Sequence, residues 1–153
     1  MAQREGGEGN RDGATSTPRL LAGSCQCGAV TYAVADEFSY ALNCHCSLCR
    51  RATGSAFKPL AGIARGKLTI TRGKDALNIL GTEDWHDARC SLCGSLLYAI
   101  VRDGQFAHVT MGTLVDTPSI RPSAHIFVGS KAEWFTITDD LPQYPEHVVR
   151  DTG

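Results

Sequence analysis

The sequence predicts a mainly β domain, and three observations support that fold class. From Leu20 onward, short runs rich in Val, Ile, Thr, Tyr and Phe alternate with Gly, Pro and Asp, which is typical of strands joined by turns. Few segments have the spacing of an amphipathic helix. The 153 residues, of which 42% are apolar, suffice for a single core, so we expect one domain.

The expected domain occupies residues 20–146, between two tails. Residues 1–19 are polar and rich in glycine, with three basic and three acidic side chains, and we expect them to be disordered. Residues 147–153 form the expected carboxy-terminal tail. The domain between them should hold all of the chain's chemistry.

Strands are expected where β-branched and aromatic residues cluster between turn residues. Lys67–Thr71 is the clearest case, because apolar and polar residues alternate with period two. The full set of expected strands is Ala29–Ala35, Lys67–Thr71, Leu77–Leu80, Ser95–Val101, Phe106–Met111, Ala124–Val128 and Glu133–Thr138.

One short helix is expected at Ser47–Thr53. Ser47 can cap its start, and Gly54 can adopt the left-handed conformation that ends a helix. Near the end of the chain, the segment 139–145 carries two prolines, and we expect an extended arm lying over the surface.

Charge and hydropathy exclude several classes of partner. Fifteen Lys and Arg oppose sixteen Asp and Glu, so no positive excess attracts nucleic acid or anionic lipid. The longest apolar run, Leu96–Val101, is six residues, whereas a membrane-spanning helix needs roughly 20. The first thirteen residues lack the apolar segment of a secretory signal. We therefore expect a cytoplasmic protein with reduced thiols and no membrane or nucleic-acid partner; the oligomeric state stays open.

Seven cysteines, an odd number, suggest metal binding rather than a disulfide set. In an extended chain, Cys25 and Cys27 project to one face, and a tight turn brings Cys90 and Cys93 together. A glycine follows each pair, as turns around a metal often require. Together the two pairs predict a closed four-sulfur structural zinc site. A redox disulfide within Cys90–Cys93 is disfavoured, because no βαβ pattern surrounds it.

The remaining cysteines, Cys44, Cys46 and Cys49, supply three thiolates within six residues. Three protein ligands and one exchangeable position make the usual catalytic zinc arrangement. The alternative is a fourth ligand from one of the five histidines, which would make this second site closed and structural.

Four blocks of the sequence resemble the glutathione-dependent formaldehyde-activating enzyme family, which also includes centromere protein V-like proteins. Their order and spacing are specific, above all in the second block. The blocks are Gly23–Val30 (GSCQCGAV), Cys44–Phe57 (CHCSLCRRATGSAF), Cys90–Ser95 (CSLCGS), and His125–Val128 (HIFV) with Trp134, Phe135 and Asp139–Pro142 (DDLP). Two features depart from the family pattern: Arg89 replaces a common aromatic residue, and Lys58–Asp87 shows little likeness.

This resemblance implies small coiled β-sheets around zinc, similar to the Rab exchange-factor-like zinc fold. It implies two zinc ions per chain, one structural and one catalytic, on the same two groups of cysteines that the spacing separates. It also implies that glutathione and formaldehyde are joined into S-hydroxymethylglutathione, formally a carbon–sulfur lyase reaction run in reverse. The partners would be a small thiol and an aldehyde.

His45 lies between two predicted ligands and is a candidate general acid. In an extended chain its side chain points away from the metal face, so local packing is the alternative. His125 is a second candidate that another strand could bring close. For either residue, an ordinary structural position is the competing interpretation.

Arg50 and Arg51 follow the last ligand of the three-cysteine group. They could bind a substrate carboxylate or offset the negative charge of a zinc–thiolate centre, and solvated surface charges are the alternative. Trp134 and Phe135 are expected to be core or arm-anchoring aromatic residues.

Two functions are therefore carried forward. The first is a zinc-dependent enzyme that joins a thiol and a reactive carbonyl. The second is a non-catalytic zinc scaffold that binds a protein partner, and a second site with four protein ligands would favour it.

Overall fold

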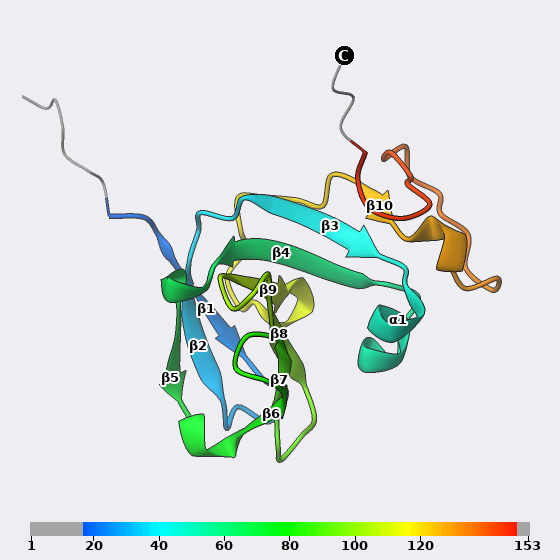
Figure 1. Cartoon of the computed structure of the whole chain (residues 1–153). Helices are drawn as coiled ribbons and strands as arrows, with labels where there is room; N and C mark the ends of the chain where they lie inside the picture. The colour runs from blue at the N-terminus through cyan, green and yellow to red at the C-terminus, as the bar shows by residue number, and fades with distance from the viewer. Residues whose placement is uncertain (1–16, 150–153) are drawn as a thin grey trace, which may run out of the picture.

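The computed structural model describes residues 17–149 and forms two β-sheets (Figure 1). The expected disordered tail lies outside the described residues except for its last three positions, and residues 150–153 of the expected carboxy-terminal tail also lie outside. Among the described residues, no helix has the length and apolar character needed to cross a membrane.

The smaller sheet has three antiparallel strands in the order β1-β2-β5. The larger sheet has seven strands in the order β10-β3-β4-β9-β8-β7-β6, and all its pairs are antiparallel except β10 with β3. The strands are β1 (Leu20–Ser24), β2 (Thr31–Ala35), β3 (Tyr40–Cys44), β4 (Lys58–Ala64), β5 (Leu68–Arg72), β6 (Leu77–Gly81), β7 (His86–Cys90), β8 (Leu96–Val101), β9 (Phe106–Thr110) and β10 (His125–Ile126).

Short helical segments connect these strands. The one α-helix of the described residues is α1 (Ser47–Thr53), between β3 and β4. Single 3-10 turns are η1 (Arg65–Lys67), η2 (Lys74–Ala76), η3 (Met111–Thr113) and η4 (Val128–Ser130). The mainly β fold class expected from the sequence is confirmed.

The main core lies between the two sheets. Strand β2 buries alternate residues, whereas β8, at the centre of the larger sheet's hairpins, is buried along its whole length. At Gly23 of β1, a Cβ atom would lie 2.0 Å from Cζ of Tyr32, so only glycine lets this ring pack against the neighbouring strand. The fully buried side chains include Leu21, Val30, Tyr32, Val34, Ile63, Leu97 and Val109.

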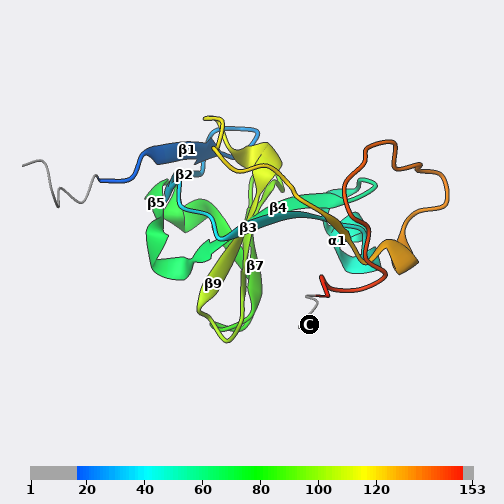
Figure 2. The ribbon, with the colours of Figure 1, turned by 90° about the horizontal axis from the view of Figure 1, so that it is seen from above.

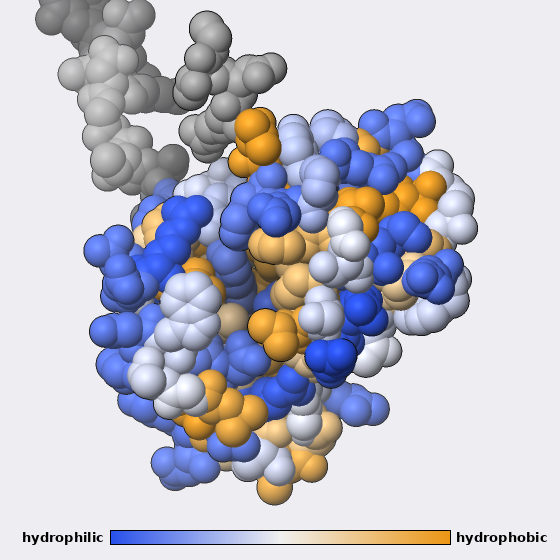
Figure 3. Space-filling view, turned by 45° about the vertical axis from the view of Figure 1, so that its right-hand side comes forward, coloured by the Kyte–Doolittle hydropathy of each residue, from blue (hydrophilic) through white to orange (hydrophobic). Residues whose placement is uncertain are grey.

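Strands β3 and β4 extend beyond this core and position the functional region. Figures 1 and 2 show that they run across one end of the molecule, with α1 and β10 at their far end. A second, smaller core formed by Cys44, Leu60 and Ile126 lies there. The face seen in Figure 3 mixes hydrophilic and hydrophobic side chains over its surface.

The expected elements differ from the structure in one wrong strand, one misassigned helix cap and four strands that were not expected, and the expected strand Ala124–Val128 is a strand only over His125–Ile126. The expected strand Glu133–Thr138 is wrong, because this segment is irregular and opens with a turn from Phe135 N–H to the Ala132 carbonyl. Helix α1 and its left-handed Gly54, at φ 63°, are confirmed, but Cys46 rather than Ser47 is the N-cap. Strands β1, β3, β4 and β7 were not among the expected strands.

The segment 139–146 runs beside β10. His125 N–H donates to the Pro142 carbonyl, Tyr144 N–H donates to the His125 carbonyl, and an isolated parallel bridge joins His125 to Gln143. This segment therefore covers the edge of the larger sheet, in an extended course, as the two prolines led us to expect.

Candidate metal centres

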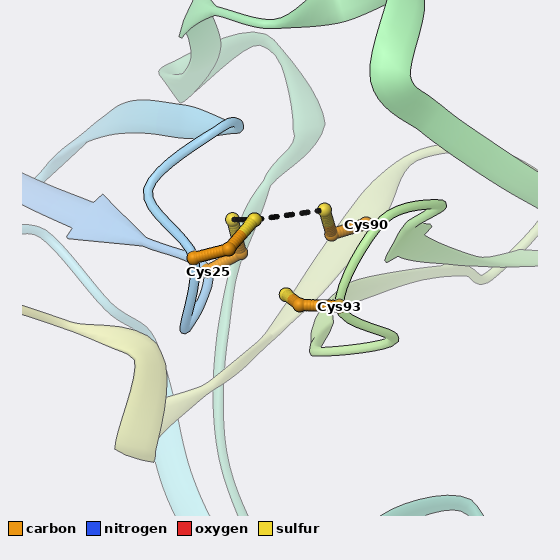
Figure 4. A group of neighbouring side chains, drawn as sticks. Cys25, Cys90 and Cys93 are labelled. Atoms are coloured by element: carbon orange, nitrogen blue, oxygen red, sulfur yellow. Dashed lines mark hydrogen bonds between the residues drawn. The ribbon is translucent and has the colours of Figure 1, made fainter.

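The cysteine sulfurs of the described residues gather in two groups. In the first group, which we call the four-cysteine cluster, all four sulfurs lie within 4.8 Å of one another. Its members come from the β1–β2 connection and the β7–β8 turn, and they are Cys25, Cys27, Cys90 and Cys93. Figure 4 shows the sulfurs of Cys25, Cys90 and Cys93 turned toward one another.

The sulfur spacing in this cluster suits one zinc ion. The sulfur of Cys27 lies 3.7 Å from that of Cys25 and 3.8 Å from that of Cys90. Tetrahedral zinc with Zn–S bonds of about 2.3 Å requires sulfurs about 3.8 Å apart. Because the donor set and its spacing both fit, these residues could hold the ion that the sequence pattern predicts.

Two glycines in the left-handed conformation shape the turns that carry these sulfurs. Gly28 has φ 79° and Gly94 has φ 81°, values that other residues adopt only with strain. Gly28 N–H donates to the Cys25 carbonyl at 3.2 Å, and Gly94 N–H donates to the Cys90 carbonyl at 2.8 Å. The expected role of a glycine after each cysteine pair is confirmed.

Hydrogen bonds to the sulfurs of Cys25 and Cys93 favour their thiolate forms, whereas burial and the neighbouring cysteines raise the pKa of Cys27 to about 11. A hydrogen bond from the Ser95 side chain lowers the pKa of Cys93 to about 5. The Val30 N–H donates to the buried sulfur of Cys25 at 3.2 Å. Thiolate is the form that binds a metal ion, so these donors prepare the cluster for one.

The second group, the three-cysteine cluster, lies where β3 meets α1. Cys44 is the last residue of β3, Cys46 is the N-cap of α1, and Cys49 is in the first turn. Their sulfurs lie within 4.8 Å of one another. The Cys46 sulfur accepts a hydrogen bond from Cys49 N–H at 3.2 Å. The same sulfur therefore caps the start of α1 and belongs to the three-cysteine cluster.

The thiols of this cluster compete for ionisation. The hydrogen bond with Cys49 lowers the pKa of Cys44, and the same interaction raises the pKa of Cys49. Lys58 is buried and lies opposite Cys44 in the pairing of β3 with β4. Its positive charge lowers the pKa of Cys49 and so counteracts part of the effect of Cys44. Several neighbouring thiolates need a cation, so this donor set also fits a divalent metal ion.

No histidine or carboxylate completes the three-cysteine cluster within the described residues. All five histidines of the chain lie in the described range, and none of them belongs to either sulfur group. The same is true of every described aspartate and glutamate. Among the described residues, three side chains, all cysteines, could therefore bind a metal ion at this cluster.

His45 is fully buried and forms one end of a line of three hydrogen-bonded side chains. Its Nε2 lies 2.8 Å from Nδ1 of His125, and the Nε2 of His125 lies 2.9 Å from a carboxylate oxygen of Asp139. A carboxylate only accepts, so a neutral His125 donates from Nε2 and accepts at Nδ1 from His45. The Nδ1 of His45 is then left as an acceptor, and it is buried with no partner among the described residues.

Burial and nearby cations keep His45 neutral. Burial, followed by the charges of His125, Lys131 and Arg50, lowers the pKa of His45 to about 4. The rings of Phe57 and Phe135 pack against it, with centroids 5.0 Å and 6.2 Å away.

The structure places the remaining expected residues as follows. Arg50 is half-buried, Arg51 is exposed, and neither forms an ion pair with a described acidic residue. Phe135 packs against Phe57 with ring centroids 5.6 Å apart, whereas Trp134 is 73% exposed.

Two residues at this end of the molecule received no role from the sequence. Lys58 is the single charged residue of an otherwise apolar strand, which was a usable signal. Asp139 lies in the DDLP segment of the fourth sequence block. The neighbouring sequence does not indicate that its hydrogen-bond partner is His125, 14 residues earlier.

Comparisons with known proteins identify relatives of this chain. A sequence model of the family described as glutathione-dependent formaldehyde-activating enzyme matches residues 20–130, which include both cysteine clusters. A Halomonas elongata protein, provisionally named as a glutathione-dependent formaldehyde-activating enzyme, is 27% identical over 128 residues, covering 77% of this chain and 81% of that protein. The crystal structure of a Rhodobacter sphaeroides protein is 28% identical, with a TM-score of 0.52, covering 64% of this chain and 91% of its own.

Proposed function

Because this chain belongs to the glutathione-dependent formaldehyde-activating enzyme family, we propose that it is a zinc-dependent enzyme that joins glutathione to formaldehyde. In this reaction the sulfur of the thiol forms a bond to the carbonyl carbon. The C=O π bond breaks, and the proton of the thiol ends on the oxygen. The product is S-hydroxymethylglutathione, and the reverse direction is a carbon–sulfur lyase reaction.

The observation that carries this proposal is the three-cysteine cluster with three protein ligands. Four-ligand zinc sites are closed, whereas a site with three protein ligands can accept a substrate atom. The count of three favours the enzyme over the zinc scaffold, for which four protein ligands were the expected sign. Two zinc ions per chain, one in each cluster, are part of the proposal.

Zinc held by Cys44, Cys46 and Cys49 would favour the nucleophilic thiolate form of a bound substrate thiol. The chain's own residues position that site. Cys46 fixes the start of α1 through its hydrogen bond from Cys49 N–H, and the buried charge of Lys58 offsets part of the thiolate charge. Holding thiol and aldehyde together in one orientation would supply most of the rate gain.

His45 has a positioning role in this proposal rather than a proton-transfer role. Its ring is buried, and its Nε2 is committed to His125, which Asp139 holds from the other side. This line of side chains joins the end of β3 to β10 and to the segment after it, and so fixes the chain between Cys44 and Cys46.

Exchange spectroscopy at equilibrium tests the proposed reaction, because thiols add to formaldehyde without an enzyme and the background must be subtracted. We expect free glutathione and its formaldehyde adduct to interconvert faster with the zinc-loaded chain than in buffer alone. The Cys46→Ser variant should lose most of this increase in rate. Serine is a favourable N-cap, so this variant should keep α1 while losing a zinc ligand. Equal exchange rates for the wild type, the variant and buffer would exclude the reaction and favour the scaffold.

The proposal includes a cytoplasmic location and small-molecule partners only. Thiolate ligands persist where thiols stay reduced, and glutathione is itself a reduced thiol. The numbers of basic and acidic residues in the chain are nearly equal, so no net positive charge attracts nucleic acid.

A further inference from the structure

A groove of about 510 Å³ lies between the end of α1 and the β7–β8 turn that carries Cys93. On one side it is lined by Ala52, Thr53 and Gly54, and on the other by Cys93, Gly94 and Ser95. It therefore contacts Cys93 of the four-cysteine cluster and the end of α1, the helix whose first turn carries the three-cysteine cluster.

Arg89 is the one basic residue among those that line this groove, and no aspartate or glutamate is among them, whereas Cys93, with its pKa lowered to about 5, contributes a thiolate. Its Nη1 donates to the Gly94 carbonyl at 3.0 Å, and its Nη2 donates to the Ala52 carbonyl at 2.6 Å. These bonds hold the guanidinium between the two walls and use two of its five N–H donors. The other donors stay available, and a guanidinium is well suited to bind a carboxylate.

The rest of the lining is rich in uncharged polar groups. Gln26, Ser95, Thr110 and Thr113 lie along it. The hydroxyl of Thr110, a residue only 9% exposed, has no hydrogen-bond partner among the described residues.

The groove begins one helical turn from the three-cysteine cluster. Thr53 lines the groove, and Cys49 belongs to the cluster four residues earlier, on the same side of α1. The Thr53 hydroxyl donates to the Cys49 carbonyl at 2.8 Å, which ties the two positions together. One turn is about 5 Å, and a short peptide of three residues spans about 10 Å when extended. Such a ligand is longer than the one helical turn that separates Thr53 from Cys49.

We propose that this groove binds a carboxylate of the thiol substrate through Arg89, while the thiol of the same short peptide reaches the three-cysteine cluster. The inference rests on the proposed function and deepens it, since it assigns this groove and Arg89 to a carboxylate of the thiol substrate. It gives Arg89 the carboxylate-binding role that the sequence suggested for Arg50 and Arg51.

S-methylglutathione is the probe, because its sulfur is blocked while its carboxylates are intact. Titration of the zinc-loaded chain by calorimetry and by amide NMR would measure its affinity and its location. We expect Arg89→Met to weaken binding about tenfold or more, as for loss of a charged hydrogen bond. Amide shifts should be largest at α1 residues 52–54 and at residues 93–95.

Arg72→Met is the matched control. Arg72 also donates a guanidinium N–H to the carbonyl of a glycine that follows a cysteine pair, Gly28, but it is not among the groove residues. We expect this variant to bind S-methylglutathione as the wild type does. Equal weakening in both variants would overturn the proposal, because it would show a general effect of losing positive charge.

Arg89→Met also removes two hydrogen bonds between the walls, so zinc content and melting temperature are measured for each variant. Gln26→Glu provides an independent test, because Gln26 is exposed and the change only adds a negative charge to the groove. We expect it to weaken binding with both zinc ions retained. Unchanged affinity in Gln26→Glu and Arg89→Met, or shifts confined to Arg50 and Arg51, would overturn the assignment.

Failure of the proposed reaction gives a different result. The wild-type chain could bind S-methylglutathione through Arg89 and yet not accelerate exchange. That result would support the carboxylate-binding groove and exclude the proposed reaction. If the chain accelerated exchange but did not measurably bind S-methylglutathione, the proposed reaction would be supported and the proposed carboxylate site in the groove would be overturned.

Discussion

His108 on β9 illustrates how burial sets the properties of single residues here. Its Nε2 lies 2.6 Å from the Tyr40 hydroxyl. Burial first, and then the charges of Lys58 and Arg102, lower its pKa from 6.5 to about 4. A protonated ring at this position would lie close to two cations, so the folded chain holds His108 in its neutral form.

This lowered pKa predicts a pH-dependent stability. Between pH 6.5 and 4 the unfolded chain binds a proton at His108 that the folded chain does not. The free energy of unfolding should therefore fall as pH falls through this window, by on the order of 3 kcal/mol, and stay constant above it. His108→Gln, which keeps a polar partner for Tyr40, should remove that part of the slope.

Denaturant unfolding at several pH values in excess zinc measures this slope. Acid also releases zinc from thiolates in every variant, so the difference between His108→Gln and the wild type isolates the histidine. His147→Gln, which removes an exposed histidine, is the control and should match the wild type. A slope unchanged by His108→Gln would contradict the assigned pKa.

At the same scale, the orientation of His45 was predictable but its partner was not. Alternation along an extended chain predicts that His45 turns away from the side shared by Cys44 and Cys46. Its contact with His125 spans 80 residues and depends on the parallel pairing of β10 with β3. No local pattern encodes a pairing of that kind.

Helix α1 shows what local sequence can determine at the scale of an element. Its bounds were predicted because the residues that end a helix lie next to it, as Gly54 does. Its cap was misassigned because a cysteine, a rare N-cap, accepts the hydrogen bond that Ser47 was expected to accept. Local signals are sufficient for the bounds here because the residues that set both ends of this seven-residue helix lie next to it in the sequence.

Strands depend more on distant residues, and the errors reflect this. Strand β4 contains proline and glycine, which are typical of turns, yet it is buried between β3 and β9. The Tyr40 ring occupies the space that a Cβ at Gly62 would need, so the glycine serves packing. Conversely, Glu133–Thr138 has the composition of a strand, but Phe135 packs against His45 and Phe57 instead.

Gly54→Ala should loosen the end of α1. At φ 63° an alanine is strained, and nothing lies within 4 Å of the added Cβ, so the cost is confined to the backbone. We expect a loss of about 1 kcal/mol of unfolding free energy. Gly66→Ala is the matched control, because its Cβ also meets nothing but its φ is not in the left-handed region. It should be neutral or slightly stabilising.

Denaturant unfolding of both glycine variants measures the difference. If Gly54→Ala were as stable as Gly66→Ala, the left-handed end of α1 would not be required. The same comparison, made on zinc affinity, would show whether the far end of α1 supports the cluster at its beginning.

At the scale of the whole molecule, the four-cysteine cluster joins the two sheets. Cys25 and Cys27 follow β1 of the smaller sheet, whereas Cys90 ends β7 of the larger one. The buried sulfurs of Cys25 and Cys90 belong to the main core. The three-cysteine cluster, in contrast, lies within one connection of the larger sheet and leaves the main core untouched.

The two clusters should therefore respond differently to the loss of a ligand. Cys90→Ser removes a bond between the sheets, and zinc binding of this kind is linked to folding, so we expect the melting temperature to fall by about 10 °C or more, with about half the zinc lost. Cys46→Ser should also lose about half the zinc but, with a serine cap retained on α1, change the melting temperature little. Elemental analysis measures the zinc content of each variant, and calorimetry on the same samples measures its melting temperature. Unfolding together with complete zinc loss in Cys46→Ser would mean that both clusters are structural, and the case for a substrate position at the three-cysteine cluster would fail.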